Sequence, residues 1–229
     1  MQAAKITSNN TASQPVSARA IPARRFYRLD NWLSETDANF LLKKKALWEA
    51  KYGHYEAAIQ LFNRLISFEP NTAQHYVNRG LVHTWQRQWD KALSDYDRAI
   101  KIDNTLDKAY SNWANLYAKK QDWAEAISNY DEAIDLNPLN TCARLNQASA
   151  FREMGNYEEA LTCLDIALFF CPGSAAIYAE RGRTYHVQGD WNCAIADYKT
   201  ALELTETHST KTSDLKVARR VKHWMDSLH

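Results

Sequence analysis

The stretch SDYDRAIKID at residues 94–103 recurs, with few changes, as SNYDEAIDLN at 128–137 and as ADYKTALELT at 196–205. All three stretches occupy the same position in a repeat of 34 residues. Self-similarity at such a fixed period is typical of arrays built from one repeated supersecondary unit. Five copies follow one another without a gap, and the register places them at 39–72, 73–106, 107–140, 141–174 and 175–208.

Two positions of the repeat have a constant side-chain size in all five copies. The eighth position is always small and the twenty-fourth is bulky, which gives Ala46, Gly80, Ala114, Ala148 and Gly182 at one and Phe62, Tyr96, Tyr130, Leu164 and Tyr198 at the other. Helix axes that cross at about 8–10 Å leave room only for small side chains at the crossing point. The two positions therefore predict closely packed helices.

Each repeat divides into two helical halves. In AEAISNYDEAIDL (124–136) the apolar residues fall on one face of an α-helix, and KAYSNWANLYAKK (108–120) has the same spacing. Turn residues such as Gly53, Gly155 and Gly189 separate the halves, and Pro70, Pro138 and Pro172 close three of the repeats. The pattern predicts two antiparallel helices in every repeat.

The stretches AISNYDEAIDLNP (126–138) and GNYEEALTCLDIALFFCP (155–172) resemble the tetratricopeptide repeat (TPR) family. The resemblance implies an all-α fold: an α-solenoid of five helix-turn-helix units that winds as a right-handed superhelix. It also implies a non-enzymatic protein that binds other proteins, as a scaffold or in the assembly of a complex.

The segment before the repeats, residues 1–38, is basic and has no acidic residue before Asp30. This composition fits a tail without packed structure, which we favour, and also an organelle transit peptide. From about residue 26 the segment is aromatic, so we expect it to pack on the first repeat. The spacing from Ser34 to Asp37 is that of a helix-start capping box.

The segment after the repeats, residues 209–229, is also basic and has apolar residues at helical spacing. A repeat array needs a terminal helix with a polar outer face to cover its last apolar surface, so we expect a capping helix here. A basic helix that binds a membrane surface or a partner is the alternative.

Composition argues against several other functions. The five repeats carry 18 basic and 22 acidic residues, so the basic excess typical of nucleic-acid binding is missing from them. The four cysteines form no CxxC pair and no zinc-binding spacing, which indicates free thiols and a cytoplasmic or other reducing compartment. We find no motif for a metal, a cofactor or catalysis, and no apolar run long enough to span a membrane.

Two repeats carry arginine at the seventh position, where the family usually has an apolar residue. These are Arg79 and Arg181, and the second helices of the same two repeats carry Asp95 and Asp197. The pattern predicts an ion pair between the two helices of each repeat.

The resemblance implies that the first helix of each repeat lines an inner groove. The predicted peptide-binding residues on this surface are Lys43, Lys44, Asn78, Trp85, Lys108, Asn112, Asn115, Lys119, Asn146, Arg152 and Arg183. Asn78, Asn112 and Asn146 share one repeat position, and their amides suit an extended peptide backbone, although packing would explain them equally well. The lysines predict an acidic partner segment.

Two alternatives to this function remain. Some TPR proteins hold the acidic tails of heat-shock chaperones in a carboxylate clamp, and Lys43, Asn78 and Lys108 match three of its five positions. Leu47 and Asn112 depart from the other two. The second alternative is RNA or single-strand binding by a helical-repeat array, which the charge of the repeats disfavours.

Overall fold

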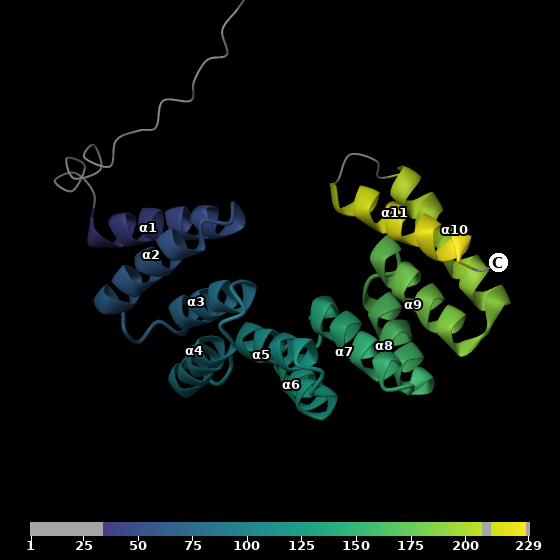
Figure 1. Cartoon of the computed structure of the whole chain (residues 1–229), viewed down its shortest axis with the longest axis horizontal. Helices are drawn as coiled ribbons and strands as arrows, with labels where there is room; N and C mark the ends of the chain where they lie inside the picture. The colour runs from purple at the N-terminus through teal and green to yellow at the C-terminus, as the bar shows by residue number, and fades with distance from the viewer. Residues whose placement is uncertain (1–33, 208–211, 228–229) are drawn as a thin grey trace, which may run out of the picture. The chain divides into compact units, whose positions relative to one another are not determined.

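The computed structural model describes residues 34–207 and 212–227, and all regular structure in these ranges is α-helical. The helices in these ranges, labelled in Figure 1, are α1 (Glu35–Lys51), α2 (Tyr55–Phe68), α3 (Ala73–Trp85), α4 (Trp89–Ile102), α5 (Asp107–Lys119), α6 (Trp123–Leu136), α7 (Thr141–Glu153), α8 (Tyr157–Phe170), α9 (Ala175–Gln188), α10 (Trp191–Thr207) and α11 (Thr212–Asp226). The all-α prediction is confirmed.

The chain forms two compact units, and the boundary between them falls inside α1, after Leu41. In the first unit Ser34 starts the helix, as its spacing to Asp37 predicts. The Ser34 hydroxyl accepts a hydrogen bond from the Asp37 backbone N–H at 3.2 Å and donates one to the Asp37 carboxylate at 2.7 Å. This cap places the start of α1 at Glu35, before Asn39. Residues 35–38 of the predicted tail (1–38) thus belong to α1, and its residues 1–33, including the aromatic stretch from residue 26, lie outside the described residues.

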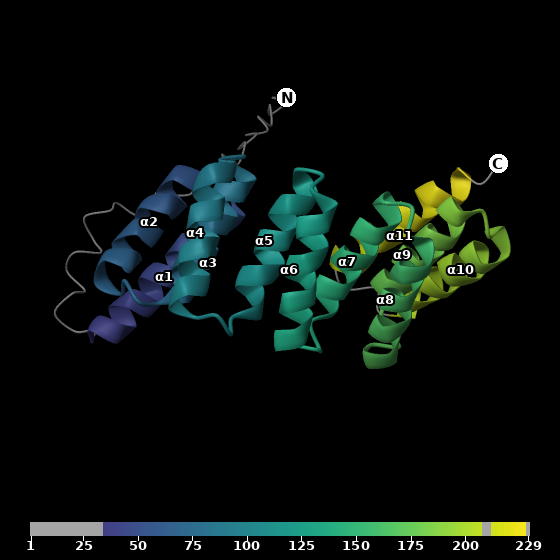
Figure 2. The same ribbon diagram turned by 90° about the horizontal axis from the view of Figure 1, so that it is seen from below.

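In the second unit the helices follow the repeat. The first helices α3, α5, α7 and α9 begin at Ala73, Asp107, Thr141 and Ala175, the first residues of their repeats. Each second helix begins at an aromatic residue that shares one repeat position, namely Tyr55, Trp89, Trp123, Tyr157 or Trp191. Consecutive helices lie antiparallel and pack against one another (Figures 1 and 2).

The turn inside each repeat needs one residue in the left-handed region of the backbone. Gly53, Gly155 and Gly189 take this conformation with φ of 83°, 82° and 93°. Arg87 and Gln121 take it in the second and third repeats, with φ of 59° and 62°, although neither is glycine. Because a side chain disfavours this region, packing of the two helices must hold these turns in place.

The small eighth position and the bulky twenty-fourth position meet inside each helix pair. A Cβ atom built on Gly80 would lie 2.7 Å from Cε1 of Tyr96, and one on Gly182 would lie 2.8 Å from Cδ1 of Tyr198. Both tyrosines are fully buried. Glycine is therefore required in these two repeats because the tyrosine ring occupies the space of a side chain.

We expect Gly80→Ala to lower the free energy of unfolding by about 1–3 kcal/mol, because the new methyl group overlaps the Tyr96 ring and the core cannot yield freely. Urea denaturation followed by circular dichroism measures the change. Gly173→Ala is the matched control, since no atom lies within 4 Å of its added Cβ, and its effect should stay within about 0.5 kcal/mol. Equal effects of the two substitutions would contradict this account of the packing.

The predicted ion pairs inside repeats two and five are confirmed. Nε of Arg79 donates to Oδ2 of Asp95 at 2.9 Å, and Nη2 donates to Oδ1 at 2.5 Å. Arg181 makes the same two-pronged contact with Asp197, at 2.7 and 2.8 Å. Both aspartates are buried, with 5% of each residue exposed. Each pair therefore joins the two helices of one repeat inside the protein.

The same arginines also reach back to the preceding repeat, which the sequence did not predict. Nη1 of Arg79 donates to Oδ1 of Asn63 on α2 at 2.6 Å, and Nη1 of Arg181 donates to Oδ1 of Asp165 on α8 at 2.7 Å. Each arginine therefore ties three helices together.

At the corresponding place in the fourth repeat, Nε2 of Gln147 donates to Oδ1 of Asp131 on α6 at 2.6 Å. The third repeat has Trp113 at this position, and its indole N–H is buried without a hydrogen-bond partner in the described part of the chain. Polar ties therefore link the first repeat to the second, the third to the fourth and the fourth to the fifth at this position.

Helix α11 covers the end of the fifth repeat, where it packs on α9 and α10 (Figure 1). Val217 and Val221 of α11 are buried in one cluster with Ala179 of α9 and with Tyr198 and Ala201 of α10. Lys216, Arg219 and Lys222 remain exposed on its outside. This arrangement gives the last repeat the polar outer surface that a repeat array needs at its end.

Candidate functional site

A pocket of about 550 Å³ lies across the first helices of the second, third and fourth repeats. Five of the predicted binding residues line it, namely Trp85, Asn112, Asn115, Lys119 and Asn146. The other lining residues are Leu81, Thr84, Tyr96, Ala118, Trp123, Tyr130, Ser149, Ala150 and Glu153. The pocket thus combines apolar surface with amides and one charge of each sign.

The floor of the pocket comes from the second helices. Tyr96 and Tyr130 are buried, and their rings pass between the helices so that each hydroxyl reaches a side chain of a first helix. The Tyr130 hydroxyl donates to Oδ1 of Asn115 at 2.6 Å, and the Tyr96 hydroxyl lies 3.0 Å from Oγ1 of Thr84. Burial raises the pKa of both tyrosines well above the ordinary value, so both stay neutral.

The asparagines of the pocket are fixed to different degrees. Nδ2 of Asn146 donates to Oδ1 of Asn115 at 2.8 Å. With the bond from Tyr130, the Asn115 oxygen therefore accepts two hydrogen bonds, and the Asn115 NH₂ group takes part in neither of them. Asn112 makes no side-chain hydrogen bond to any residue that the structure describes. The pocket therefore presents amide donors and acceptors that are not used up by the fold.

Asn78, the third asparagine at the repeat position of Asn112 and Asn146, lies elsewhere. Asn78 does not line the pocket, and its Oδ1 accepts a hydrogen bond from Nε2 of Gln74 at 3.1 Å. The pocket thus contains two of the three asparagines that share this repeat position, Asn112 and Asn146.

The predicted lysines divide in the same way. Lys119 lines the pocket and is exposed, whereas Lys43, Lys44 and Lys108 lie outside it on α1 and α5. Lys108 is exposed and Lys43 is half-buried. None of the three residues that match the chaperone-tail clamp, Lys43, Asn78 and Lys108, lines this pocket.

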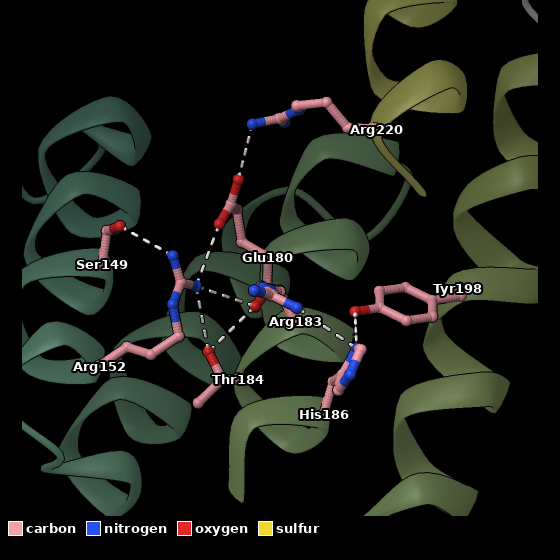
Figure 3. Close-up of polar contacts among 8 residues, drawn as sticks. All are labelled: Ser149, Arg152, Glu180, Arg183, Thr184, His186, Tyr198 and Arg220. Carbon is pink, nitrogen blue, oxygen red and sulfur yellow. Dashed lines mark hydrogen bonds and ion pairs between the residues drawn. The ribbon is translucent and has the colours of Figure 1, made fainter. Parts of the chain in front are cut away.

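Arg152 and Arg183 belong to a different group of side chains, which Figure 3 shows. Arg152 donates through Nη1 to Oε2 of Glu180 at 3.1 Å and through Nη2 to Oγ of Ser149 at 2.9 Å, and only 10% of its side chain is exposed. Nη1 of Arg183 lies 3.4 Å from Nδ1 of His186. Arg152 is thus engaged with the next repeat, outside the pocket.

Sequence reasoning missed the contribution of the second helices to the site. Tyr96 and Tyr130 line the pocket, although their repeat position predicted only packing, and Trp123 lines it as well. The signal was present at the twenty-fourth position, where Tyr96 and Tyr130 carry a hydroxyl that Phe62 and Leu164 lack.

The described residues contain no group of three or more His, Cys, Asp or Glu side chains that could hold a metal ion. The four cysteines carry free thiols, and burial raises the pKa of the Cys163 thiol to about 11. None of the helices in 34–207 and 212–227 combines the length and hydropathy that crossing a membrane requires.

A family model for the tetratricopeptide repeat matches residues 46–107, 111–175 and 145–208. The chain belongs to the tetratricopeptide repeat family. Its α-helical solenoid and its repeats support a general role as a protein-interaction scaffold, and proteins of this family are generally non-enzymatic.

Solved structures of TPR proteins share the fold. The thermophilic TPR protein TTC0263 of Thermus thermophilus is 18% identical, with a TM-score of 0.68 over 82% of this chain and 98% of its own. A crystal structure of MamA is 19% identical, with a TM-score of 0.61 over 77% of this chain and 97% of its own. A comparison with curated protein sequences gave no match.

Proposed function

We propose that this TPR protein is a binding scaffold that holds an extended segment of a partner protein in the pocket formed by α3, α5 and α7. The observation that carries the proposal is the set of amides in the pocket. Asn112 and Asn146 occupy the same position of successive repeats, and Asn115, on the same helix as Asn112, accepts a hydrogen bond from Asn146. An extended backbone offers one N–H and one C=O per residue, and an Asn side chain can pair with both.

The apolar part of the pocket fits a side chain of the same segment. Leu81, Trp85, Ala118 and Ala150 come from three different helices and line the pocket together with the amides. Trp85 is 45% exposed, which is a large apolar surface to leave in water. A partner residue that covers this surface would supply affinity, while the amides would fix the direction of the chain.

An acidic residue in the partner segment is the further element of the proposal. Lys119 lies in the pocket, and Lys43, Lys44 and Lys108 lie on first helices of the same array. Glu153 brings a negative charge to the pocket, so the acidic preference should be local to Lys119 and not spread over the whole pocket.

Selection of a random peptide library on the full chain, followed by affinity measurement of the enriched peptides, tests the proposal. We expect Asn112→Ala to weaken their binding about tenfold, because the loss of a hydrogen bond to a largely desolvated backbone group costs about 1–2 kcal/mol. The melting temperature should not change, since Asn112 makes no side-chain hydrogen bond within the described chain.

Asn192→Ala is the matched control, because Asn192 is exposed on a second helix, α10, and does not line the pocket. It should leave the affinities unchanged. If Asn112→Ala lowers the melting temperature and leaves binding per folded molecule intact, the amides are structural and the proposal is wrong.

A further inference from the structure

The repeat position that carries Asn78, Asn112 and Asn146 carries a carboxylate, Glu180, in the fifth repeat. Glu180 is bound from two sides, as Figure 3 shows. Nη1 of Arg152 on α7 donates to its Oε2 at 3.1 Å, and Nη1 of Arg220 on α11 donates to its Oε1 at 3.0 Å. The side chain of Glu180 is 15% exposed. This end of the array therefore already holds one carboxylate between two arginines.

The positive charges at this end of the array outnumber the negative charge of Glu180. Arg183 on α9 and Arg220 on α11 both lie against the ring of Trp224, with guanidinium carbons 5.6 and 5.2 Å from its centroid. Lys216 precedes Arg220 by one helical turn, so both lie along the same edge of α11, and Lys216 is exposed. Together with Arg152, four cationic side chains thus accompany the single carboxylate of Glu180.

The guanidinium groups have binding capacity to spare. Arg220 uses Nη1 for Glu180, its side chain is 48% exposed, and an arginine carries five N–H donors. Arg183 makes no ion pair with any acidic residue in the described ranges, and its polar neighbours are His186 and Tyr198. Burial first, and then the charge of Arg183, lower the pKa of His186, so the imidazole stays neutral and adds no charge of its own.

We propose that Arg183, Lys216 and Arg220 form a second binding surface, distinct from the pocket, that takes Asp and Glu side chains of a partner protein. Glu180 shows that a carboxylate fits this geometry, because it accepts from Arg220 at 3.0 Å. Stacking on Trp224 holds the guanidinium groups in place, which reduces the entropy lost when a second carboxylate binds.

The arrangement favours an acidic protein segment over a nucleic acid. Proteins that bind single strands stack bases on open aromatic rings. The ring of Trp224 is instead covered by Arg183 and Arg220, and the ring of Tyr198 lies 6.1 Å from it, centroid to centroid. The surface therefore offers mainly charge and hydrogen-bond donors, and the ring of Trp224 is occupied by the two guanidinium groups.

Fluorescence anisotropy of the full chain with a labelled octaglutamate peptide at low salt tests the proposal. We expect Lys216→Gln and Arg183→Gln each to weaken binding about three- to tenfold. Lys222→Gln is the matched control, since it removes the same charge from the opposite edge of α11, and it should change the affinity less than about twofold. Octaglutamine should not bind.

The outcomes separate this proposal from its alternatives. Equal losses for Lys216→Gln and Lys222→Gln, or no octaglutamate binding, would overturn it, and tighter binding of oligouridine with the same dependence on Lys216 would assign the surface to nucleic acid. Arg183→Gln also removes a contact with Trp224, so Lys216→Gln is the deciding variant if the melting temperature of the former falls. Asn112→Ala should leave octaglutamate binding unchanged, which keeps the two binding surfaces separately testable.

Discussion

Asp95→Ala is expected to lower the free energy of unfolding by about 3 kcal/mol. The Asp95 side chain is 7% exposed and receives two hydrogen bonds from Arg79, so its removal leaves a guanidinium with no carboxylate partner in a mostly buried site. Urea denaturation monitored by circular dichroism gives the value. Asn63 still accepts one hydrogen bond from Arg79, which places the expected loss at the lower end of the range for broken buried pairs.

Asp97→Ala is the matched control for this experiment. Asp97 lies on the same helix, its side chain is 46% exposed, and it pairs with Lys101 one turn away. Such surface pairs contribute about 0.5 kcal/mol at most, so the control should be close to the wild type. If both substitutions cost the same, the arginine that joins three helices has no special part in stability.

Lys119→Glu is expected to weaken the binding of pocket-selected peptides by about 2 kcal/mol, or about thirtyfold, if those peptides carry an acidic residue next to the Lys119 position. The substitution replaces attraction with repulsion and adds a second negative charge beside Glu153 in the same pocket. Titration of the labelled peptides with wild-type and variant protein measures the difference.

Lys120→Glu makes the same change of net charge one residue later. Lys120 is exposed, does not line the pocket and lies over the ring of Tyr117. Lys120→Glu should weaken peptide binding less than about threefold, and this loss should disappear at high salt, because an exposed charge outside the pocket acts on the peptide only through long-range electrostatics that salt screens. Equal effects of the two variants would show that Lys119 does not meet the partner directly.

Much of the fold followed from the sequence because its determinants are local and repeated. The helix starts at Ala73, Asp107, Thr141 and Ala175 coincide with the repeat register, since the small, bulky and turn positions recur in every copy. The pairing of Arg79 with Asp95 was predictable because both residues lie in one repeat and the pattern returns in the fifth. The start of α1 departs from the repeat register, because the Ser34 cap, which its spacing to Asp37 predicted separately, begins the helix before Asn39.

The candidate site was less predictable, because it depends on contacts between particular residues of neighbouring repeats. Asn78 and Asn112 occupy one repeat position, yet Asn78 pairs with Gln74 whereas Asn112 lines the pocket. The engagement of Arg152 with Glu180 joins two different repeat positions, and no other pair of described repeats has it. A shared repeat position therefore predicts where on its helix a side chain is attached, whereas the neighbouring side chains decide what it can bind.

The missing polar tie at Trp113 has a mechanical consequence. Residues 73–106 and 107–140 are all described, and no side-chain hydrogen bond connects these two repeats. They meet through apolar packing, for example of Tyr96 against Leu116. A small sliding of one repeat on the other at this junction therefore breaks no side-chain hydrogen bond, unlike at the other three junctions. The pocket spans this junction, so its width can change there without the loss of a side-chain hydrogen bond between these two repeats.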